Sequence, residues 1–121
     1  MARTITNYQP IYAFGDQCGY LQTIETEGFK AVEVEYFLDE EYRGQGIMSS
    51  HFPSYLQFLK DRGFTRLVAH VKKGNYVSKK LLKKNKFFKF NELDNVEIFL
   101  CVGALKPTKA RIQEVKEMIY N

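Results

Sequence analysis

The stretch Leu38-Asp39-Glu40-Glu41-Tyr42-Arg43-Gly44-Gln45-Gly46-Ile47 decides the predicted fold. It follows an alternating apolar run at residues 31–38 and precedes a helical pattern that starts near Ile47. Its two glycines allow the sharp turn that joins a strand to a helix. The main-chain N–H groups at the start of that helix would point outward, with the positive end of the helix dipole behind them. The stretch therefore predicts a strand, a turn and a helix that together suit a phosphate, with Arg43 adding positive charge.

Two common phosphate-binding motifs do not fit this stretch. It lacks the Lys-Ser/Thr of a P-loop, and no third glycine follows at the spacing of a dinucleotide-binding turn. A Gly-x-Gly pair alone is also compatible with a purely structural turn. The rest of the chain must therefore decide between an anion site and a simple connection.

Strand patterns precede the turn. The first clear strand covers residues 11–14, and residues 18–26 and 31–38 alternate between apolar and polar side chains. Turn signals at Gly15-Asp16 and Glu27-Gly28 separate these runs and predict hairpins. In the third run, Glu33 and Glu35 lie on the face opposite to the apolar side chains.

A helix, two strand regions and a second helix follow the turn. Residues 47–62 carry apolar side chains three and four positions apart, and Pro53 predicts a late start or a kink in this helix. Residues 65–71 form a strand, and residues 78–84 form a short helix that Asn75 or Ser78 caps. Residues 87–90 and 96–102 form two more strands, and a final helix covers about 107–120.

This order predicts one α/β (α+β) domain over residues 1–121, with its core at about 11–104. The strand–helix–strand unit around the glycine turn predicts a parallel crossover in a mixed, mostly antiparallel sheet of about six strands. The C-terminal helix is additional, and it either covers a gap at the short front of the fold or makes a homodimer.

Composition and charge exclude several classes of protein. With 45% hydrophobic and 26% charged residues the chain is globular, and no apolar run is long enough for a membrane span. Cys18 and Cys101 lie in apolar strand patterns and no secretion signal is seen, so we expect reduced thiols and a cytoplasmic protein. No Cys/His cluster has the spacing of metal ligands, so no metal is expected.

The net charge of +4 is unevenly distributed. Eight lysines lie between Lys72 and Lys89, which suits either an anionic ligand or a solvated helix face. Nucleic acid is a weaker alternative, because the aromatic residues beside the lysines fit a strand of the core.

The stretch at 38–47 closely resembles the acetyl-CoA motif of the GNAT acyltransferases. Further landmarks of that family follow in order: a helix ending in Asp61-Arg62-Gly63-Phe64, a strand at 65–71, and a segment from Asn75 to Phe87 that resembles the family's Asn-x-x-Ala/Ser helix. The resemblance covers roughly residues 11–104. It implies an acetyl-CoA-dependent N-acyltransferase that acts on a primary amine of a protein or a small molecule.

The resemblance also implies which residues hold the cofactor. The main chain near Phe37 and Leu38 would pair with the pantetheine arm as an added strand does. Asn75, with Ser78 in the same segment, would steady the pantetheine. From the charge of this segment, rather than from the resemblance, we expect Lys79, Lys80 or Lys83 to meet the 3′-phosphate. The pyrophosphate would bind the N–H groups of the turn, namely Arg43, Gly44, Gln45, Gly46, Ile47 and Met48.

Direct attack of an amine on a thioester needs a base, and Glu33 and Glu35 lie on the strand where the family's catalytic Glu is often found. Tyr36 is a candidate donor to the leaving thiolate, because Leu82 occupies the position of the family's usual Tyr. The alternatives are that the two glutamates form a solvated strand face and that Tyr36 belongs to the core. His51 and His70 are interpreted as structural.

A second hypothesis is a GNAT-like module that has lost its chemistry and acts as an inhibitor through protein–protein contact. Leu82 motivates it, as does Met48, which replaces the small residue of the commonest family pattern. The family's first strand and two helices also find no room before Ile11, which is the third reason for this hypothesis.

Overall fold

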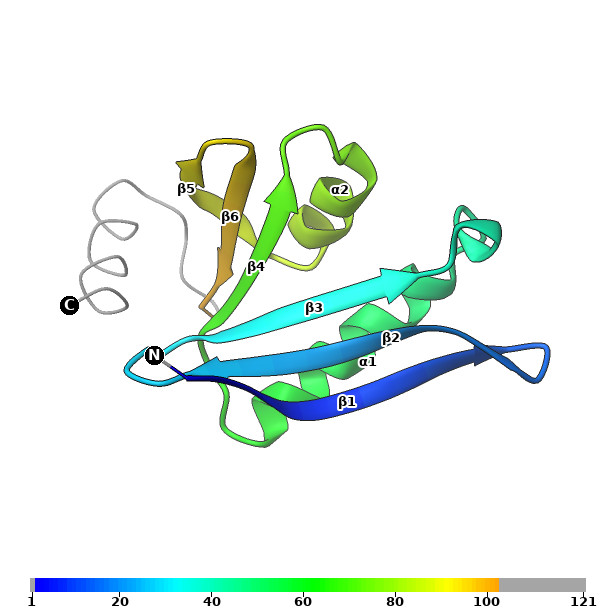
Figure 1. Cartoon of the computed structure of the whole chain (residues 1–121), viewed down its shortest axis with the longest axis horizontal. Helices are drawn as coiled ribbons and strands as arrows, with labels where there is room; N and C mark the ends of the chain where they lie inside the picture. Colours follow the sequence, from blue (N-terminus) through cyan, green and yellow to red (C-terminus); the bar gives the residue numbers. More distant parts are fainter. Residues whose placement is uncertain (1, 103–121) are drawn as a thin grey trace.

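The computed structural model describes residues 2–102 of the chain (Figure 1). Its elements are β1 (Arg3–Ala13), β2 (Asp16–Thr26), β3 (Val32–Leu38), the short 3-10 helix η1 (Glu40–Tyr42), α1 (Ile47–Asp61), β4 (Leu67–Lys72), α2 (Tyr76–Lys84), β5 (Phe88–Leu93) and β6 (Val96–Cys101). The predicted helix at about 107–120 lies outside the described residues.

The six described strands form one sheet in the order β1-β2-β3-β4-β6-β5. Only β3 and β4 are parallel, and the other four neighbouring pairs are antiparallel. Helix α1 makes the crossover between the two parallel strands, as a parallel connection requires. The predicted class, a mixed and mostly antiparallel sheet with one strand–helix–strand crossover, is confirmed.

The sheet parts between β3 and β4. Their ladder holds only the pairs Val32–Leu67 and Glu33–Val68, whereas six pairs join β2 to β3. Beyond Glu33 the two strands diverge, and Figure 1 shows them as two arms of a V. We call the space between these arms the split. It opens toward the glycine turn at the end of β3.

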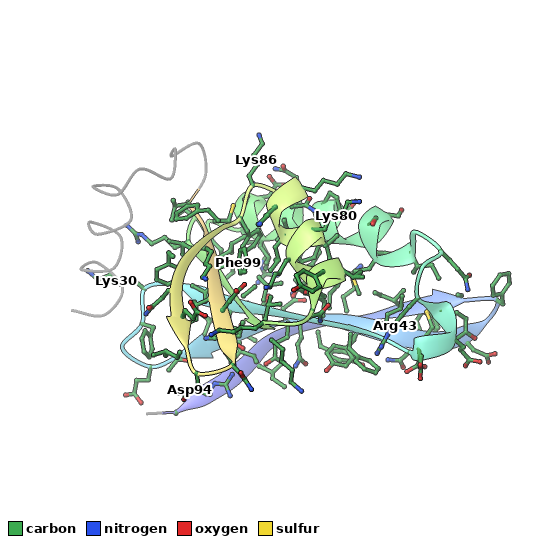
Figure 2. The ribbon with its side chains drawn as sticks, turned by 90° about the horizontal axis from the view of Figure 1, so that it is seen from above. Lys30, Arg43, Lys80, Lys86, Asp94 and Phe99 are labelled. Carbon is green, nitrogen blue, oxygen red and sulfur yellow. The ribbon has the colours of Figure 1, made fainter. Side chains whose placement is uncertain are left out.

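Both helices pack against the same face of the sheet, as Figure 2 shows. The main core joins buried side chains of α1 and α2 to those of the strands, including Phe52 and Leu59 of α1, Leu82 of α2 and Val34 of β3. We call this side the helix face. No described helix covers the other side of β1, β2 and β3, which we call the open face; it carries Tyr8, Tyr20, Gln22, Glu33, Glu35 and Phe37.

Two expectations about element boundaries are wrong. Strand β1 begins at Arg3, not at residue 11, because this edge strand is mostly exposed and lacks the apolar alternation that marks a buried strand. Helix α1 begins at Ile47, as its apolar pattern predicts, so the late start, one of the two alternatives drawn from Pro53, is wrong. Pro53 is exposed, while the buried stripe of α1 runs along other positions.

The two cysteines are free and buried, as expected for core thiols. In residues 2–102, neither α1 nor α2 combines the length and the apolar character that crossing a membrane requires.

Candidate functional site

The glycine turn has the conformation that its sequence predicts. Gly44 and Gly46 have φ angles of 77° and 78°, in the left-handed region that side chains disfavour. A Cβ atom built on either glycine meets nothing within 4 Å, so the space above the turn is open. The backbone conformation, rather than crowding, therefore requires glycine at both positions.

The N-terminus of α1 is left without a side-chain cap. Gly46 stands at the capping position, and its carbonyl accepts the first helical bond from Ser50 N–H at 3.1 Å. The preceding N–H groups of Ile47, Met48 and Ser49 have no partner within the helix. Together with the helix dipole they form a site suited to an anion.

Arg43 belongs to the edge of this site. Its main-chain N–H donates to Glu40 O at 3.2 Å, so it is used within η1. Its side-chain Nε donates to Leu38 O at 2.8 Å, and the guanidinium lies 5.6 Å from the centre of the Phe37 ring. Arg43 thus fixes the end of β3 and keeps its charge beside the turn, where Figure 2 labels it.

The main chain of β3 presents hydrogen-bonding groups to the split. Val32 N–H donates to Arg66 O at 3.0 Å, which directs the peptide groups of Val32 toward β4. Because these groups alternate along a strand, those of Val34 and Tyr36 point the same way, past the last pair of the ladder. The main chain of these two residues offers an edge for an extended ligand, a role that sequence reasoning did not assign to either.

The main chain predicted to pair with the pantetheine is placed differently. Phe37 O points toward β2, where a Cβ on Gly19 would come within 2.1 Å of it. Leu38 O is already an acceptor for Arg43. The free edge of β3 therefore lies at Val34 and Tyr36, one to four residues earlier than the resemblance implied.

A pair of hydroxyl groups bridges the split on the helix face. The Tyr36 hydroxyl, from β3, hydrogen-bonds the Ser78 hydroxyl of α2. The Tyr36 ring also packs edge-on against Phe52 of α1, with ring centres 5.0 Å apart. Burial raises the pKa of Tyr36, an effect that the Ser78 hydrogen bond partly offsets.

Helix α2 is fixed by its first residues. The Asn75 side chain accepts a hydrogen bond from Ser78 N–H at 3.1 Å, which confirms the predicted cap. Leu82, at the position of the family's usual Tyr, is fully buried in the core. The other nearby hydroxyl on α2, that of Tyr76, belongs to a side chain that is 76% exposed, with the Lys79 ammonium 5.1 Å from its ring centre.

The predicted phosphate-binding Lys79 points to β6. Its Nζ lies 2.9 Å from Glu97 Oε2, and both side chains are mostly buried. The ion pair with Lys79 is the main cause that lowers the pKa of Glu97. Lys80 and Lys83 line a hollow of about 700 Å³ on the same side of α2, so this part of the lysine cluster faces β6 rather than the turn.

On the open face, Glu33 gathers two cationic side chains. Its Oε1 lies 3.0 Å from Arg3 Nη2 of β1 and 3.5 Å from His70 Nδ1 of β4. Burial alone would raise the pKa of Glu33. The hydrogen bond and charge of His70, a hydrogen bond with Glu35 and the charge of Arg3 outweigh burial and lower this pKa below its ordinary value. Glu33 is therefore held as a carboxylate at neutral pH.

Glu35 lies one step further along the same face. Its Oε2 accepts a hydrogen bond from Gln22 Nε2 at 2.9 Å, and its Oε1 lies 3.8 Å from Arg3 Nη2. Neither glutamate is therefore a merely solvated side chain.

Sequence reasoning missed Arg3 and treated His70 as structural. The His70 side chain is 44% exposed and faces Glu33. The period of two along β4 places His70 on the side opposite to the buried Ala69 and Val71, which was the available signal. His51, the other histidine, lies on α1, the helix that packs on the helix face of the sheet. Among residues 2–102, no three side chains of the metal-binding types form a cluster.

Comparison with known proteins gives a family. The model of the acetyltransferase (GNAT) domain matches residues 10–87. No curated protein matches the sequence. Among solved structures, the ribosomal-protein-S5-alanine acetyltransferase of Vibrio fischeri is similar, with 24% identity, a TM-score of 0.65 and 77% of this chain covered.

Two more solved structures share the fold. A RimL ribosomal L7/L12 alpha-N-protein acetyltransferase in complex with coenzyme A has 26% identity and a TM-score of 0.62 over 75% of this chain. An acetyltransferase of Salmonella typhimurium that modifies the N-terminal serine of L7/L12 has 25% identity and a TM-score of 0.60 over 76%. The match covers 58%, 58% and 60% of the three structures' own chains, respectively. Since the family model spans more than half of the sequence, the chain belongs to the GNAT acetyltransferase family.

Proposed function

We propose that this chain transfers the acetyl group of acetyl-CoA to a primary amine of a protein or a small molecule, by direct attack of the amine on the thioester. The observation that supports this most strongly is the parting of β3 from β4 directly before a glycine turn whose helix lacks a side-chain cap. The pantetheine arm of CoA would pair with the free edge of β3, and its pyrophosphate would bind the N-terminus of α1. The two sites follow one another in the same order as these two parts of CoA.

The described residues suit the donor in two places. The uncapped N–H groups of Ile47, Met48 and Ser49 would hold the pyrophosphate, and the open space above Gly46 leaves room for it. The peptide groups of Val34 and Tyr36 would pair with the amide groups of pantetheine as a neighbouring strand would. The thioester would then lie toward the narrow end of the split.

The two faces of the split offer different chemistry. Glu33 and Glu35 are carboxylates on the open face, from which an amine can approach. On the helix face, burial keeps the Tyr36 hydroxyl protonated, since it raises the pKa of Tyr36. This hydroxyl, which its hydrogen bond to Ser78 holds in place, would donate to the leaving thiolate. Leu82, at the position of the family's usual Tyr, is buried and has no hydroxyl to donate.

The acceptor is proposed only as a class. Three similar structures are named for acetylation of ribosomal proteins, and two of those names specify the alpha-amino group or an N-terminal serine. A protein amine is therefore the first acceptor to test, followed by small primary amines. The free, buried thiols of Cys18 and Cys101 suit a reducing compartment, so we place the reaction in the cytoplasm.

Calorimetry with acetyl-CoA, supported by native mass spectrometry for retained CoA, tests the proposal directly. We expect binding by the wild-type protein and none by Gly46→Glu, which places a carboxylate in the phosphate site. Failure to bind at millimolar acetyl-CoA would reject the proposal. Binding without transfer to any amine would instead support the second hypothesis, a module that acts through protein–protein contact.

A further inference from the structure

A hollow of about 550 Å³ opens on the sheet beside Glu33. Its lining residues come from three strands and the β2–β3 turn: Arg3, Thr26, Phe29, Glu33 and His70. Glu33 pairs with Val68 in the last pair of the β3–β4 ladder, and His70 lies two residues after Val68 on β4. The contact between Glu33 and His70 therefore spans the narrow end of the split, where one side chain from each arm meets the other.

The orientation of the imidazole matters for proton transfer. His70 Nδ1 faces the Glu33 carboxylate at 3.5 Å. In the neutral ring, a hydrogen on Nδ1 directed at this carboxylate leaves the lone pair on Nε2. Glu33 would then fix the tautomer and stabilise the imidazolium that forms when Nε2 takes a proton, as a buried carboxylate does for a histidine base.

From this geometry we infer that His70 is the base for the acceptor amine and that Glu33 positions it. The inference rests on the proposed function. His70 Nε2 takes one proton from the acceptor ammonium, and the free amine forms a C–N bond to the acetyl carbon while the C–S bond breaks. The second amine proton passes to the thiolate by way of the Tyr36 hydroxyl, and the imidazolium returns its proton to water. The hollow is the acceptor site, where the amine would meet His70.

Other charged groups face the imidazole and set the pH response. Glu33 and Glu35 of β3 favour the imidazolium, whereas Arg3 of β1, 3.0 Å from Glu33, opposes it. Lys72, on the same face of β4 by its spacing, opposes it more weakly. Arg3 and His70 both contact Oε1 of Glu33, so the imidazole shares this carboxylate with a guanidinium.

The tautomer of His70 gives a test that needs no acceptor. The chain has two histidines, so ¹⁵N-histidine labelling yields two imidazole signals, and the His51→Gln variant assigns them. We expect His70 to carry its hydrogen on Nδ1 in the wild type and to shift toward the Nε2–H form in Glu33→Ala. An Nε2–H tautomer in the wild type would overturn the inference.

Two small acceptors test the chemical role. Ethylamine is protonated at neutral pH and needs a base, whereas hydroxylamine is not protonated and does not. We expect His70→Gln to lower kcat/KM for ethylamine by about 10²-fold or more and to leave hydroxylamine nearly unaffected. His51→Gln should match the wild type with both amines.

Equal losses with both amines would show a structural role for His70 and reject the inference. A wild-type protein that binds acetyl-CoA but acetylates neither amine would also count against a base in this hollow. If acetyl-CoA does not bind, the proposed function fails by itself, and the tautomer measurement still decides whether Glu33 orients His70.

Discussion

The hydroxyl oxygen of Tyr55 lies 2.6 Å from Thr23 Oγ1, and this bond joins α1 to β2 inside the core. Both residues are almost completely buried. Tyr55→Phe should leave Thr23 Oγ1 without its partner in the core, so we expect a loss of about 1–2 kcal/mol in the free energy of unfolding, measured with urea. Tyr12→Phe is the matched control, since Tyr12 is 62% exposed. Equal stabilities of the two variants would contradict this assignment.

Gly46→Ala and Gly63→Ala separate stability from cofactor binding. Both glycines have positive φ angles, 78° and 92°, and neither would place a Cβ within 4 Å of another atom. Each variant should therefore lose about 1–2 kcal/mol of stability from backbone strain alone. Only Gly46→Ala should also weaken acetyl-CoA binding in calorimetry, because Gly63 follows the far end of α1. Equal affinities would argue against the turn as the pyrophosphate site.

Asn75 has a structural role and a proposed binding role, which two substitutions distinguish. Asn75→Ala removes the cap of α2 and should cost about 1 kcal/mol. Asn75→Asp keeps an oxygen for Ser78 N–H and should retain the stability. If the Asn75 amide also donates to pantetheine, Asn75→Asp should bind acetyl-CoA more weakly than the wild type. An unchanged affinity would leave Asn75 as a cap alone.

Acidification should reveal the carboxylate of Glu33. Its pKa is lowered from the ordinary 4.5, so the folded state binds the Glu33 proton less tightly than the unfolded state does. The stabilisation is complete above that value and is lost as the pH falls through the lower, folded pKa. The difference in Tm between the wild type and Glu33→Gln should therefore be largest near neutral pH and should shrink below about pH 4.5.

The control for this measurement is Glu27→Gln, in the exposed β2–β3 turn. Its Tm difference from the wild type should stay constant over the same pH range. A constant difference for Glu33→Gln as well would show that the carboxylate is not stabilised by Arg3 and His70.

Local signals allowed the sequence to predict the turn and the cap. A left-handed backbone favours glycine, so Gly44 and Gly46 by themselves indicate the turn. Asn is likewise a preferred capping residue, so Asn75 indicates the start of α2. The extent of β1 could not be predicted in the same way, because an exposed edge strand shows little apolar alternation.

The convergence at Glu33 depends on tertiary structure. Arg3 and His70 are separated from Glu33 by 30 and 37 positions, and only the order β1-β2-β3-β4 brings them onto one face. Likewise, the charge of Lys79 suited a residue that binds phosphate. The position of Glu97 on β6 determines where the Lys79 ammonium points. Periodicity assigns a residue to a face, whereas its partner depends on which strand lies next to it.

The parting of β3 from β4 also bears on how the protein avoids aggregation. An unpaired strand edge invites another chain to add a strand, and proteins usually protect such edges. Here the unpaired stretch of β3 lies inside the sheet rather than at its margin, and it narrows to ordinary strand spacing at Glu33. A foreign strand would have to enter a wedge that closes ahead of it, whereas a thin, flexible ligand arm would not be obstructed. The shape of the sheet thus excludes a second strand and admits a thinner ligand arm, before any side chain recognises a ligand.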